Sequence, residues 1–251
     1  MRISVLHPSR GRPRPAEAAV AEWTTRASGC HAIEWLLSVD ADDPCLDAYR
    51  KVARARGLTL LVGANRSIVD AVNAAARRSS GDLLVVASDD FGCPRDWDEA
   101  LCRAIGPDLD RALLVADGVE DRIMTLPVLG RPFLDALGHV YHPDYVSMYA
   151  DDELTEVARR RGKLVDARHL LFEHRHYTKL GSDPDETYRR QNSQRAFRHG
   201  WRVLQRHRAE RFTGRRPVRI WPRLLAIEAA HGLRTLSDRV RSPTGPWAPP
   251  R

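Results

Sequence analysis

The sequence predicts an α/β protein with a mostly parallel sheet, because short apolar runs alternate with helical patterns over the first 120 residues. The runs that we expect to form buried strands are Ile3–Leu6, Glu34–Val39, Leu58–Val62, Leu83–Ala87 and Ala112–Ala116. The patterns that we expect to form helices are Ala16–Arg26, Cys45–Arg56, Ser67–Arg78 and Asp96–Ile105. This alternation favours parallel strands with helices on both faces of the sheet.

After residue 120 the alternation is less regular. We expect two more strands, at Ile123–Val128 and Leu170–Tyr177, and two more helices, at Arg131–Leu137 and Asp151–Arg161. Acidic residues occupy the first turn of the second helix, and Gly162 follows its end. The sheet is therefore expected to extend over most of the chain.

The composition is that of a globular protein. Of 251 residues, 43% are apolar and 29% are charged, which excludes a disordered polyelectrolyte. No run reaches the roughly 18 apolar residues of a transmembrane helix, and the N-terminus lacks the apolar segment of a secretory signal. The four cysteines lie far apart without a CxxC pair, which disfavours a disulfide framework or a zinc site. We expect a cytoplasmic protein.

Charge is distributed unevenly along the chain. The net charge is +7, but residues 189–223 hold twelve arginines and one acid, Glu210. A polyanionic partner would explain this segment, whereas general overuse of arginine would not explain the loss of acids. We predict a main domain over 1–188, a basic helical extension over 189–241, and a mobile proline-rich tail over 242–251.

Polar residues follow the predicted strands, where ligands bind in parallel sheets. These segments are His-Pro-Ser-Arg at 7–10, Asp-Ala-Asp-Asp at 40–43, Gly-Ala-Asn-Arg at 63–66 and Ser-Asp-Asp at 88–90. Neither a GxGxxG dinucleotide motif nor a GxxxxGK[ST] phosphate loop is present. Carboxylates at two strand ends favour a site for Mg²⁺ or Mn²⁺, which can bridge a diphosphate.

Four segments together carry a resemblance to a known family. They are ISVLHPSRGRP, SVDADDP, GDLLVVASDDFGCPRDWDEAL and YADDELTEVARRRG, within residues 1–177. Their order and spacing resemble the GT-A fold (Rossmann-like) glycosyltransferases, most closely the inverting family-two type. The resemblance implies a catalytic domain over 1–188, a nucleotide diphosphate-sugar donor, with a UDP-sugar favoured, and a divalent cation.

The third segment resembles the metal-binding DxD region of that family. Asp90 matches the final acid and would bind the metal, and Asp89 would bind the metal or the nucleotide ribose. Ser88 stands where the family has its first acid, which is a departure. A cation would offset the charges of both the carboxylates and the diphosphate. The alternative is that the two acids only form a turn or a helix cap.

The first strand ends carry the expected nucleotide contacts. By resemblance, the residues that line the nucleotide-sugar are Pro8, Ser9, Arg10, Asp40, Asp42, Asn65 and Asp89, with Arg66 beside them. Asp40 would accept from the base or ribose, and Arg10 would contact base or phosphate. Alternatively, Arg10 is an ordinary surface arginine, the acids at 40–43 cap the following helix, and Asn65 is an N-cap.

The fourth segment carries the expected catalytic base. Leu154 and Gly162 match the family spacing if Asp151 is the base, and Asp152 is the second candidate. The acid that usually precedes the base is Ala150 here. An inverting transfer needs a base that deprotonates the attacking acceptor hydroxyl. The alternative is that both acids only complement the helix dipole.

Two late histidines complete the predicted metal site. The family often supplies a histidine to the metal or the diphosphate after the catalytic helix. His174 and His176 share one face of the predicted strand Leu170–Tyr177. We expect His174 to bind, with His176 as the second choice. A structural role is the alternative.

The acceptor can be addressed only through the basic segment. Phe197, Trp201 and Leu204 form an apolar stripe at helical spacing, and an adjacent stripe contains Arg195, Arg198, Arg202 and Arg206. Such a helix could simply dock on the main domain with a solvated arginine face. As acceptors we favour DNA with a hydroxymethylated pyrimidine slightly over a lipid-linked acceptor at a membrane surface.

Two other functional classes compete with a glycosyltransferase. A nucleotidyltransferase that makes nucleotide-sugars would need a GxGxR-type loop, which HPSRGRPRP does not match. A non-catalytic nucleic-acid-binding protein could have kept the fold and lost the chemistry. The paired acids Asp89–Asp90 and Asp151–Asp152 disfavour that alternative.

Overall fold

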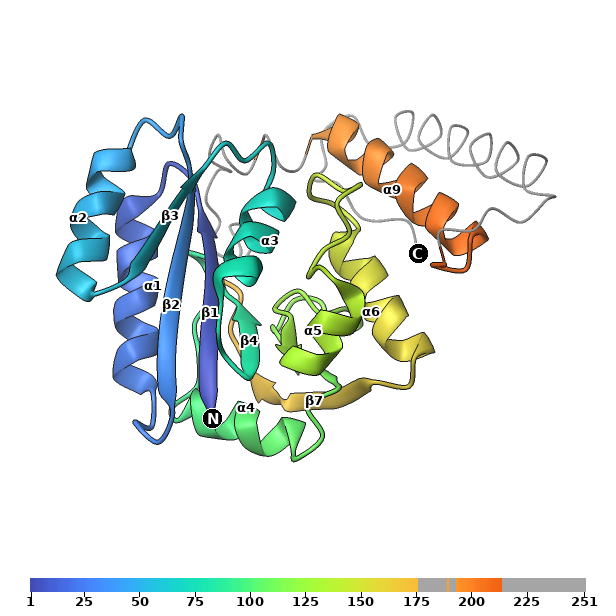
Figure 1. Ribbon diagram of the computed structural model, residues 1–251, viewed down its shortest axis with the longest axis horizontal. Coiled ribbons are helices and arrows are strands. Elements are labelled where there is room, and N and C mark those ends of the chain that lie inside the picture. The colour runs from blue at the N-terminus through green and yellow to red at the C-terminus, as the bar shows by residue number, and fades with distance from the viewer. Residues whose placement is uncertain (176–188, 190–192, 214–251) are drawn as a thin grey trace. The chain divides into compact units, whose positions relative to one another are not determined.

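A computed structural model describes residues 1–175, 189 and 193–213 (Figure 1). The chain divides into two compact units, Met1–Gly200 and Trp201–Arg251. His176, the tail 242–251 and most of the predicted extension lie outside the described residues. Within the described part, no helix is long and apolar enough to cross a membrane.

A seven-stranded sheet forms the centre of the first unit, in the order β3-β2-β1-β4-β6-β5-β7. The strands are β1 (Arg2–Ser9), β2 (Ala32–Asp40), β3 (Thr59–Gly63), β4 (Leu83–Val86), β5 (Ala112–Ala116), β6 (Val128–Gly130) and β7 (Leu164–Leu171). Only β6 runs antiparallel to its neighbours β4 and β5. The mostly parallel sheet predicted from the sequence is therefore confirmed.

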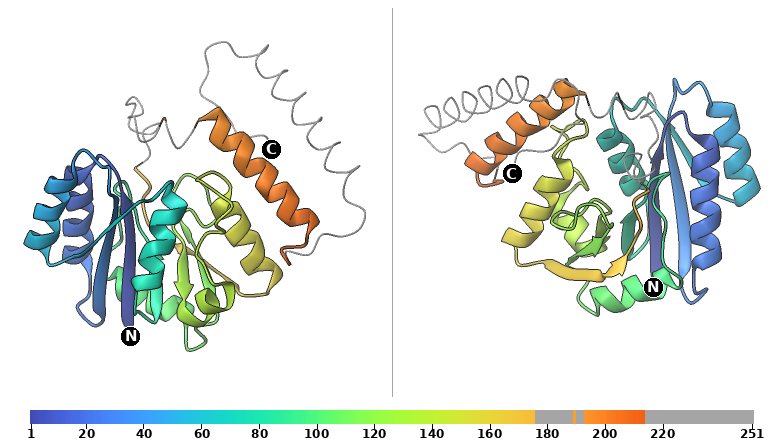
Figure 2. Two further views of the ribbon diagram at one scale, coloured as in Figure 1. Left: turned by 45° about the horizontal axis from the view of Figure 1, so that its top comes forward. Right: turned by 180° about the vertical axis from the view of Figure 1, so that it is seen from behind.

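Helices cover both faces of this sheet. They are α1 (Pro13–Arg26), α2 (Leu46–Arg56), α3 (Ile68–Arg78), α4 (Trp97–Ile105), α5 (Arg131–Leu137) and α6 (Ala150–Arg160), and α9 (Gln194–Ala209) spans the boundary between the units. Around strands β1, β2 and β3, helices α1 and α2 lie on one side and α3 on the other (Figure 2). Because β1 pairs in parallel with both β2 and β4, the carboxyl ends of these three strands lie at one edge of the sheet.

An aromatic cluster fixes the packing of α1 and α4 on the sheet. The rings of Trp23 and Trp97 lie 4.9 Å apart, and Phe172 lies 5.5 Å from Trp23. The Trp23 indole donates to the Phe91 carbonyl, and the Trp97 indole donates to the Trp23 carbonyl, each at 2.8 Å. Burial of these rings against one another, with the hydrogen bond to Phe91, anchors the chain that follows the acidic loop at 88–90.

Two predicted strands are placed differently in the structure. The strand expected at Ile123–Val128 is β6 (Val128–Gly130), because Met124 and Leu126 bury their side chains from a loop. The strand expected at Leu170–Tyr177 is β7 (Leu164–Leu171). Beyond it, Phe172 packs into the tryptophan cluster, while its backbone N–H donates to the Ala116 carbonyl at 2.8 Å.

The buried carboxylate of Asp98 offers a test of this packing. It accepts hydrogen bonds at 2.7 Å from the backbone N–H and the hydroxyl of Ser28, which ties α4 to the end of α1. These bonds lower the Asp98 pKa against the opposing effect of burial. We expect Asp98→Asn to reduce the free energy of unfolding by about 1–3 kcal/mol at neutral pH, measured by urea denaturation.

The same measurement at low pH checks the cause. Because the folded-state pKa is lowered, the stabilisation is present above the unfolded pKa and is lost as pH falls through the folded pKa. The difference between wild type and Asp98→Asn should therefore shrink in acid. A difference that stays constant at acidic pH would contradict a role for the Asp98 charge.

Candidate active site

A cavity of about 760 Å³ opens at the carboxyl edge of the sheet, within the unit Met1–Gly200. Its size is that of a site for a small organic ligand. Strand ends supply one set of lining residues: Pro8, Ser9, Arg10, Asp40, Ser88, Asp89 and Asp90. The remaining walls include Arg66, Thr125, Tyr141, Asp151, His174, Arg195 and His199. The cavity thus brings together residues from most of the predicted site segments.

The carboxylate of Asp89 is turned back toward the sheet. One oxygen lies 2.8 Å from Nε2 of the fully buried His7, and the other accepts from the Ser9 hydroxyl at 3.0 Å. Tyr49 supports this arrangement, because its hydroxyl lies 2.7 Å from Ser9 Oγ. Both oxygens of Asp89 therefore have protein partners, and the cavity wall next to Asp90 is held rigidly.

Asp90 faces a histidine across the cavity. One oxygen accepts from the Ser88 hydroxyl at 2.5 Å, and the other lies 3.5 Å from His174 Nε2. Burial by itself would raise the pKa of Asp90, but His174 and Ser88 outweigh it and lower that pKa to about 2. Asp90 is thus an anion at any physiological pH.

His174 lies between two carboxylates. Its Nδ1 is 3.5 Å from an oxygen of Asp117, on the side opposite Asp90. Burial would lower the pKa of His174, but the two carboxylates raise it to about 9. The ring stacks on Phe91, with the centroids 4.3 Å apart. Asp117 directly follows strand β5 and belongs to none of the sequence motifs that indicated the site.

The donor set of Asp90 and His174 fits a divalent cation. Both residues line the cavity, and a carboxylate oxygen of Asp90 lies 3.5 Å from the Nε2 atom of His174. Carboxylate and imidazole are ligands that suit Mn²⁺, and an exogenous phosphate could complete the coordination. Asp89 is adjacent, although His7 and Ser9 already engage its oxygens.

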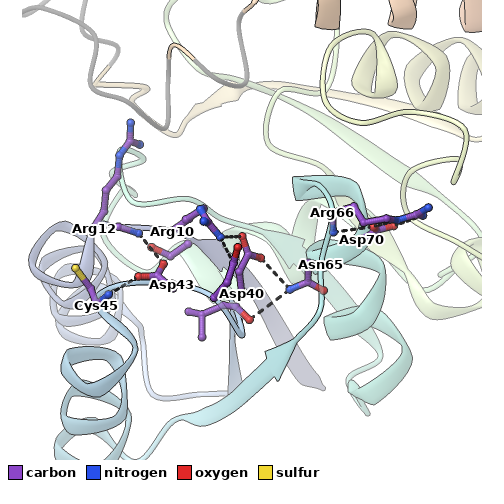
Figure 3. Close-up of polar contacts among 12 residues, drawn as sticks. Arg10, Arg12, Asp40, Asp43, Cys45, Asn65, Arg66 and Asp70 are labelled. Carbon is purple, nitrogen blue, oxygen red and sulfur yellow. Dashed lines mark hydrogen bonds and ion pairs between the residues drawn. The ribbon is translucent and has the colours of Figure 1, made fainter.

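Arg10 joins the ends of β1 and β2 (Figure 3). Its guanidinium lies 2.5 Å from carboxylate oxygens of both Asp40 and Asp42. The Asn65 side chain donates to Asp40 at 3.1 Å. Of these four residues, Arg10 and Asp40 line the cavity. The alternative in which Asn65 caps a helix does not describe this structure, because Ser67 caps α3 by accepting from the Asp70 N–H at 3.2 Å.

Asp43 connects the loop after β1 with the loop after β2 at the carboxyl edge of the sheet (Figure 3). Its carboxylate accepts from the Gly11 N–H at 2.8 Å and from the Cys45 N–H at 2.7 Å. It therefore fixes the turn before α2 and holds the first loop against it. Arg66 pairs with Asp70 at 3.0 Å beside the start of α3, and both the start of α3 and Arg66 line the cavity.

The structure distinguishes Asp151 from Asp152. Both lie in the first turn of α6, but only Asp151 lines the cavity. Burial, followed by the nearby charge of Asp152, raises the pKa of Asp151 above its ordinary value of 3.8. Tyr141 lies close enough for its own pKa to be raised by burial and by the Asp151 charge. In the described part of the chain, no group hydrogen-bonds to the Tyr141 hydroxyl.

The start of α9 forms a basic wall of the cavity. Arg195 and His199 are one helical turn apart and both line it, whereas Arg198 is exposed and does not. His199 donates to the Asp144 carbonyl at 2.8 Å, and Phe197 packs edge-on against Tyr149 at 6.2 Å. The contact of Phe197 agrees with the alternative in which this helix docks through its aromatic residues.

The remaining predicted arginines, Arg202 and Arg206, belong to the second unit. Arg202 is exposed and Arg206 is half-buried, and both lie on α9. The second histidine of the predicted metal pair, His176, lies outside the described residues.

Comparison with known proteins identifies the fold. No protein-family model and no curated protein sequence matches this chain. A mannosyltransferase from Pyrobaculum calidifontis, in complex with GDP-Man and Mn²⁺, matches with a TM-score of 0.59 and 18% identity over 90% of this chain and 68% of that one.

Two further solved structures match in the same way. Glucosyl-3-phosphoglycerate synthase from Mycobacterium tuberculosis, with Mn²⁺, UDP and glucosyl-3-phosphoglycerate, gives a TM-score of 0.54 and 13% identity, covering 72% of this chain and 75% of that one. TarS from S. aureus, in complex with UDP, gives a TM-score of 0.55 and 14% identity, covering 89% of this chain and 78% of that one. The chain therefore has the GT-A fold of these glycosyltransferases, as its sequence motifs predicted.

Proposed function

We propose that the protein is a metal-dependent glycosyltransferase that moves a sugar from a nucleotide diphosphate-sugar to an acceptor hydroxyl with inversion. The observation that carries the proposal is the convergence of Asp90, His174 and Asp151 on one cavity at the carboxyl edge of a GT-A sheet. Solved proteins of the same fold contain UDP or GDP-Man, and two of them also contain Mn²⁺.

The ends of β1 and β2 form the donor side of the proposed site. Arg10 and Asp40 line the cavity there, and Asn65, which does not line it, donates a hydrogen bond to Asp40. In this proposal Pro8, Ser9 and Arg10 contact the nucleotide, and Asp40 accepts from the base or ribose. Asp42 and Asn65 act indirectly, through Arg10 and Asp40. We favour a UDP-sugar as donor.

Asp90 and His174 would hold the divalent cation, Mn²⁺ or Mg²⁺. When bound, such a cation offsets the charge of the diphosphate leaving group. Asp89 supports this side of the site by joining the acidic loop to His7 and Ser9. The lowered pKa of Asp90 keeps its carboxylate charged for this role.

Asp151 is the proposed catalytic base. It would accept the proton of the acceptor hydroxyl as that oxygen attacks the anomeric carbon, so that the configuration inverts. Its raised pKa suits proton transfer, because a more basic carboxylate accepts a proton more readily. Tyr141 is placed to hydrogen-bond the acceptor beside this base. Asp152 affects the reaction through its charge.

The acceptor that we propose is a hydroxymethylated pyrimidine in DNA. Arg195 and His199 supply positive charge on the cavity wall, and the exposed Arg198 and Arg202 could contact phosphates. Such a pyrimidine would have to flip out of the DNA base stack to reach Asp151. A lipid-linked acceptor at an anionic membrane surface is the competing candidate, supported by the same basic residues.

The first prediction concerns the cation. We expect Asp90→Ala to reduce transfer by at least about 100-fold and to abolish the strengthening of UDP binding by Mn²⁺, because the leaving diphosphate loses its compensating charge. Calorimetric titration with UDP, with and without Mn²⁺, measures the second effect. Equal strengthening in wild type and Asp90→Ala would remove Asp90 from the proposed site.

The second prediction separates the two acids of α6. Asp151→Asn should reduce kcat by about 100-fold or more while donor affinity stays close to wild type, because the base acts on the acceptor. Asp152→Asn is the matched control and should retain most of the activity. Near-wild-type turnover by Asp151→Asn would assign the base to Asp152.

The pH profile tests the same assignment. The rate should fall as pH drops through the pKa of Asp151, and this acid limb should lie above pH 4 because that pKa is raised. Asp152→Asn removes a nearby negative charge, so the limb should shift to lower pH. A limb that is unmoved in Asp152→Asn would argue against titration of Asp151.

The third prediction concerns the acceptor. Wild-type protein with UDP-glucose and Mn²⁺ should add a hexose to DNA containing 5-hydroxymethyl pyrimidine and not to unmodified DNA, as read by mass spectrometry. Arg195→Gln should raise the acceptor KM more than Arg198→Gln, since only Arg195 lines the cavity. Salt-sensitive DNA binding without a mass gain would instead indicate a non-catalytic DNA-binding protein. The absence of DNA binding at low salt would favour a lipid-linked acceptor.

A further inference from the structure

Asp117 is a buried acid beside the proposed cation site to which the proposed reaction gives no role. It directly follows strand β5 and is completely buried. It does not line the cavity, so it is not placed to touch a donor or an acceptor. A buried carboxylate is costly unless it is hydrogen-bonded or paired, so its partners indicate what it does.

Three donors fix the Asp117 carboxylate in place. Oδ1 accepts from the backbone N–H groups of Val119 at 2.6 Å and Glu120 at 2.7 Å. Oδ2 accepts from the Thr125 hydroxyl at 2.8 Å. The same oxygen, Oδ2, lies 3.5 Å from His174 Nδ1. The loop after β5 thus presents one immobilised carboxylate oxygen to the histidine.

His174 is held on its other sides as well. Its backbone N–H donates to the Asp117 carbonyl at 2.9 Å, and its ring stacks on Phe91 at 4.3 Å. A backbone bridge joins Phe91 and His174. With Nδ1 directed to Asp117, the second ring nitrogen, Nε2, faces Asp90 in the cavity.

We propose that Asp117 is a positioning residue for His174: its fixed carboxylate oxygen faces Nδ1 and orients the ring so that Nε2 is directed to a divalent cation shared with Asp90. The inference rests on the proposed function, because it assigns the cation to that site. Carboxylate partners of metal-binding histidines orient the ring in this way. Thr125 contributes by holding the oxygen that faces the ring.

The test is Mn²⁺ binding by the full chain, measured by calorimetry without donor or acceptor. Asp117→Asn should weaken Mn²⁺ binding by roughly 10- to 100-fold, the usual effect of losing such a partner. UDP binding in the absence of Mn²⁺ should be unchanged. Thr125→Val should weaken Mn²⁺ binding by several-fold, because Asp117 keeps its charge but its Oδ2 loses the hydrogen bond that fixes its position against His174.

Asp98→Asn is the matched control for a merely structural role. Asp98 is a fully buried aspartate that accepts two hydrogen bonds from Ser28 and does not line the cavity. Its replacement should lower the Tm without changing the affinity for Mn²⁺. Equal losses of Mn²⁺ affinity in Asp98→Asn and Asp117→Asn would overturn the inference.

Two further variants separate this inference from the proposed function. If Asp90→Ala and His174→Ala both bind Mn²⁺ as tightly as wild type, the cation site itself is wrong. If both bind weakly while Asp117→Asn and Thr125→Val match wild type, the cation site stands and the positioning role is wrong. Should Asp117→Asn fail to fold, the Thr125→Val result alone decides, and an unchanged affinity overturns the inference.

Discussion

Charge compensation at one edge of the sheet is the constraint on which the site depends. Strands that run in the same direction bring their carboxyl ends to one edge, so Asp40, Asp89, Asp90 and Asp117 lie along that edge although they are far apart in sequence. Asp117 is buried and the other three are partly buried, and carboxylates that lose hydration need a donor or a cation. The pairs are Arg10 with Asp40, His7 with Asp89, and His174 with both Asp90 and Asp117. One histidine thus serves two acids.

The short strand β6 makes that sharing possible. It lies between β4 and β5 and runs antiparallel to both, so β4 and β5 run in the same direction and end at the same edge. The acidic loop after β4 and Asp117 after β5 therefore approach His174 from opposite sides. The tryptophan cluster holds the arrangement, since Trp23 binds the Phe91 carbonyl and packs on Phe172.

Local patterns in the sequence predicted the sheet and the strand ends well. Most apolar runs became strands at the expected places, and the acids at 89–90 and 151 came to line one cavity. Pairings between distant segments were not predictable. Asp117 lies in Ala-Asp-Gly, which resembles any turn, and its importance comes from Thr125 and His174. The burial of Phe172, which follows the end of β7, likewise depends on its contact with Trp23, far away in the sequence.

The acids of the cavity differ in pKa because their partners differ. Burial would raise the pKa of both Asp90 and Asp117, but the shared His174 and the hydrogen-bond donors around each carboxylate lower it to about 2, so both are charged near neutral pH. Asp151 has no cationic partner among the described residues, so burial raises its pKa and its carboxylate can exchange a proton. Such divergence between like groups separates charge-holding from proton-transferring roles. Arg195 lines the same cavity as Asp151 without pairing with it, so the proposed acceptor would meet positive charge while the proposed base keeps its raised pKa.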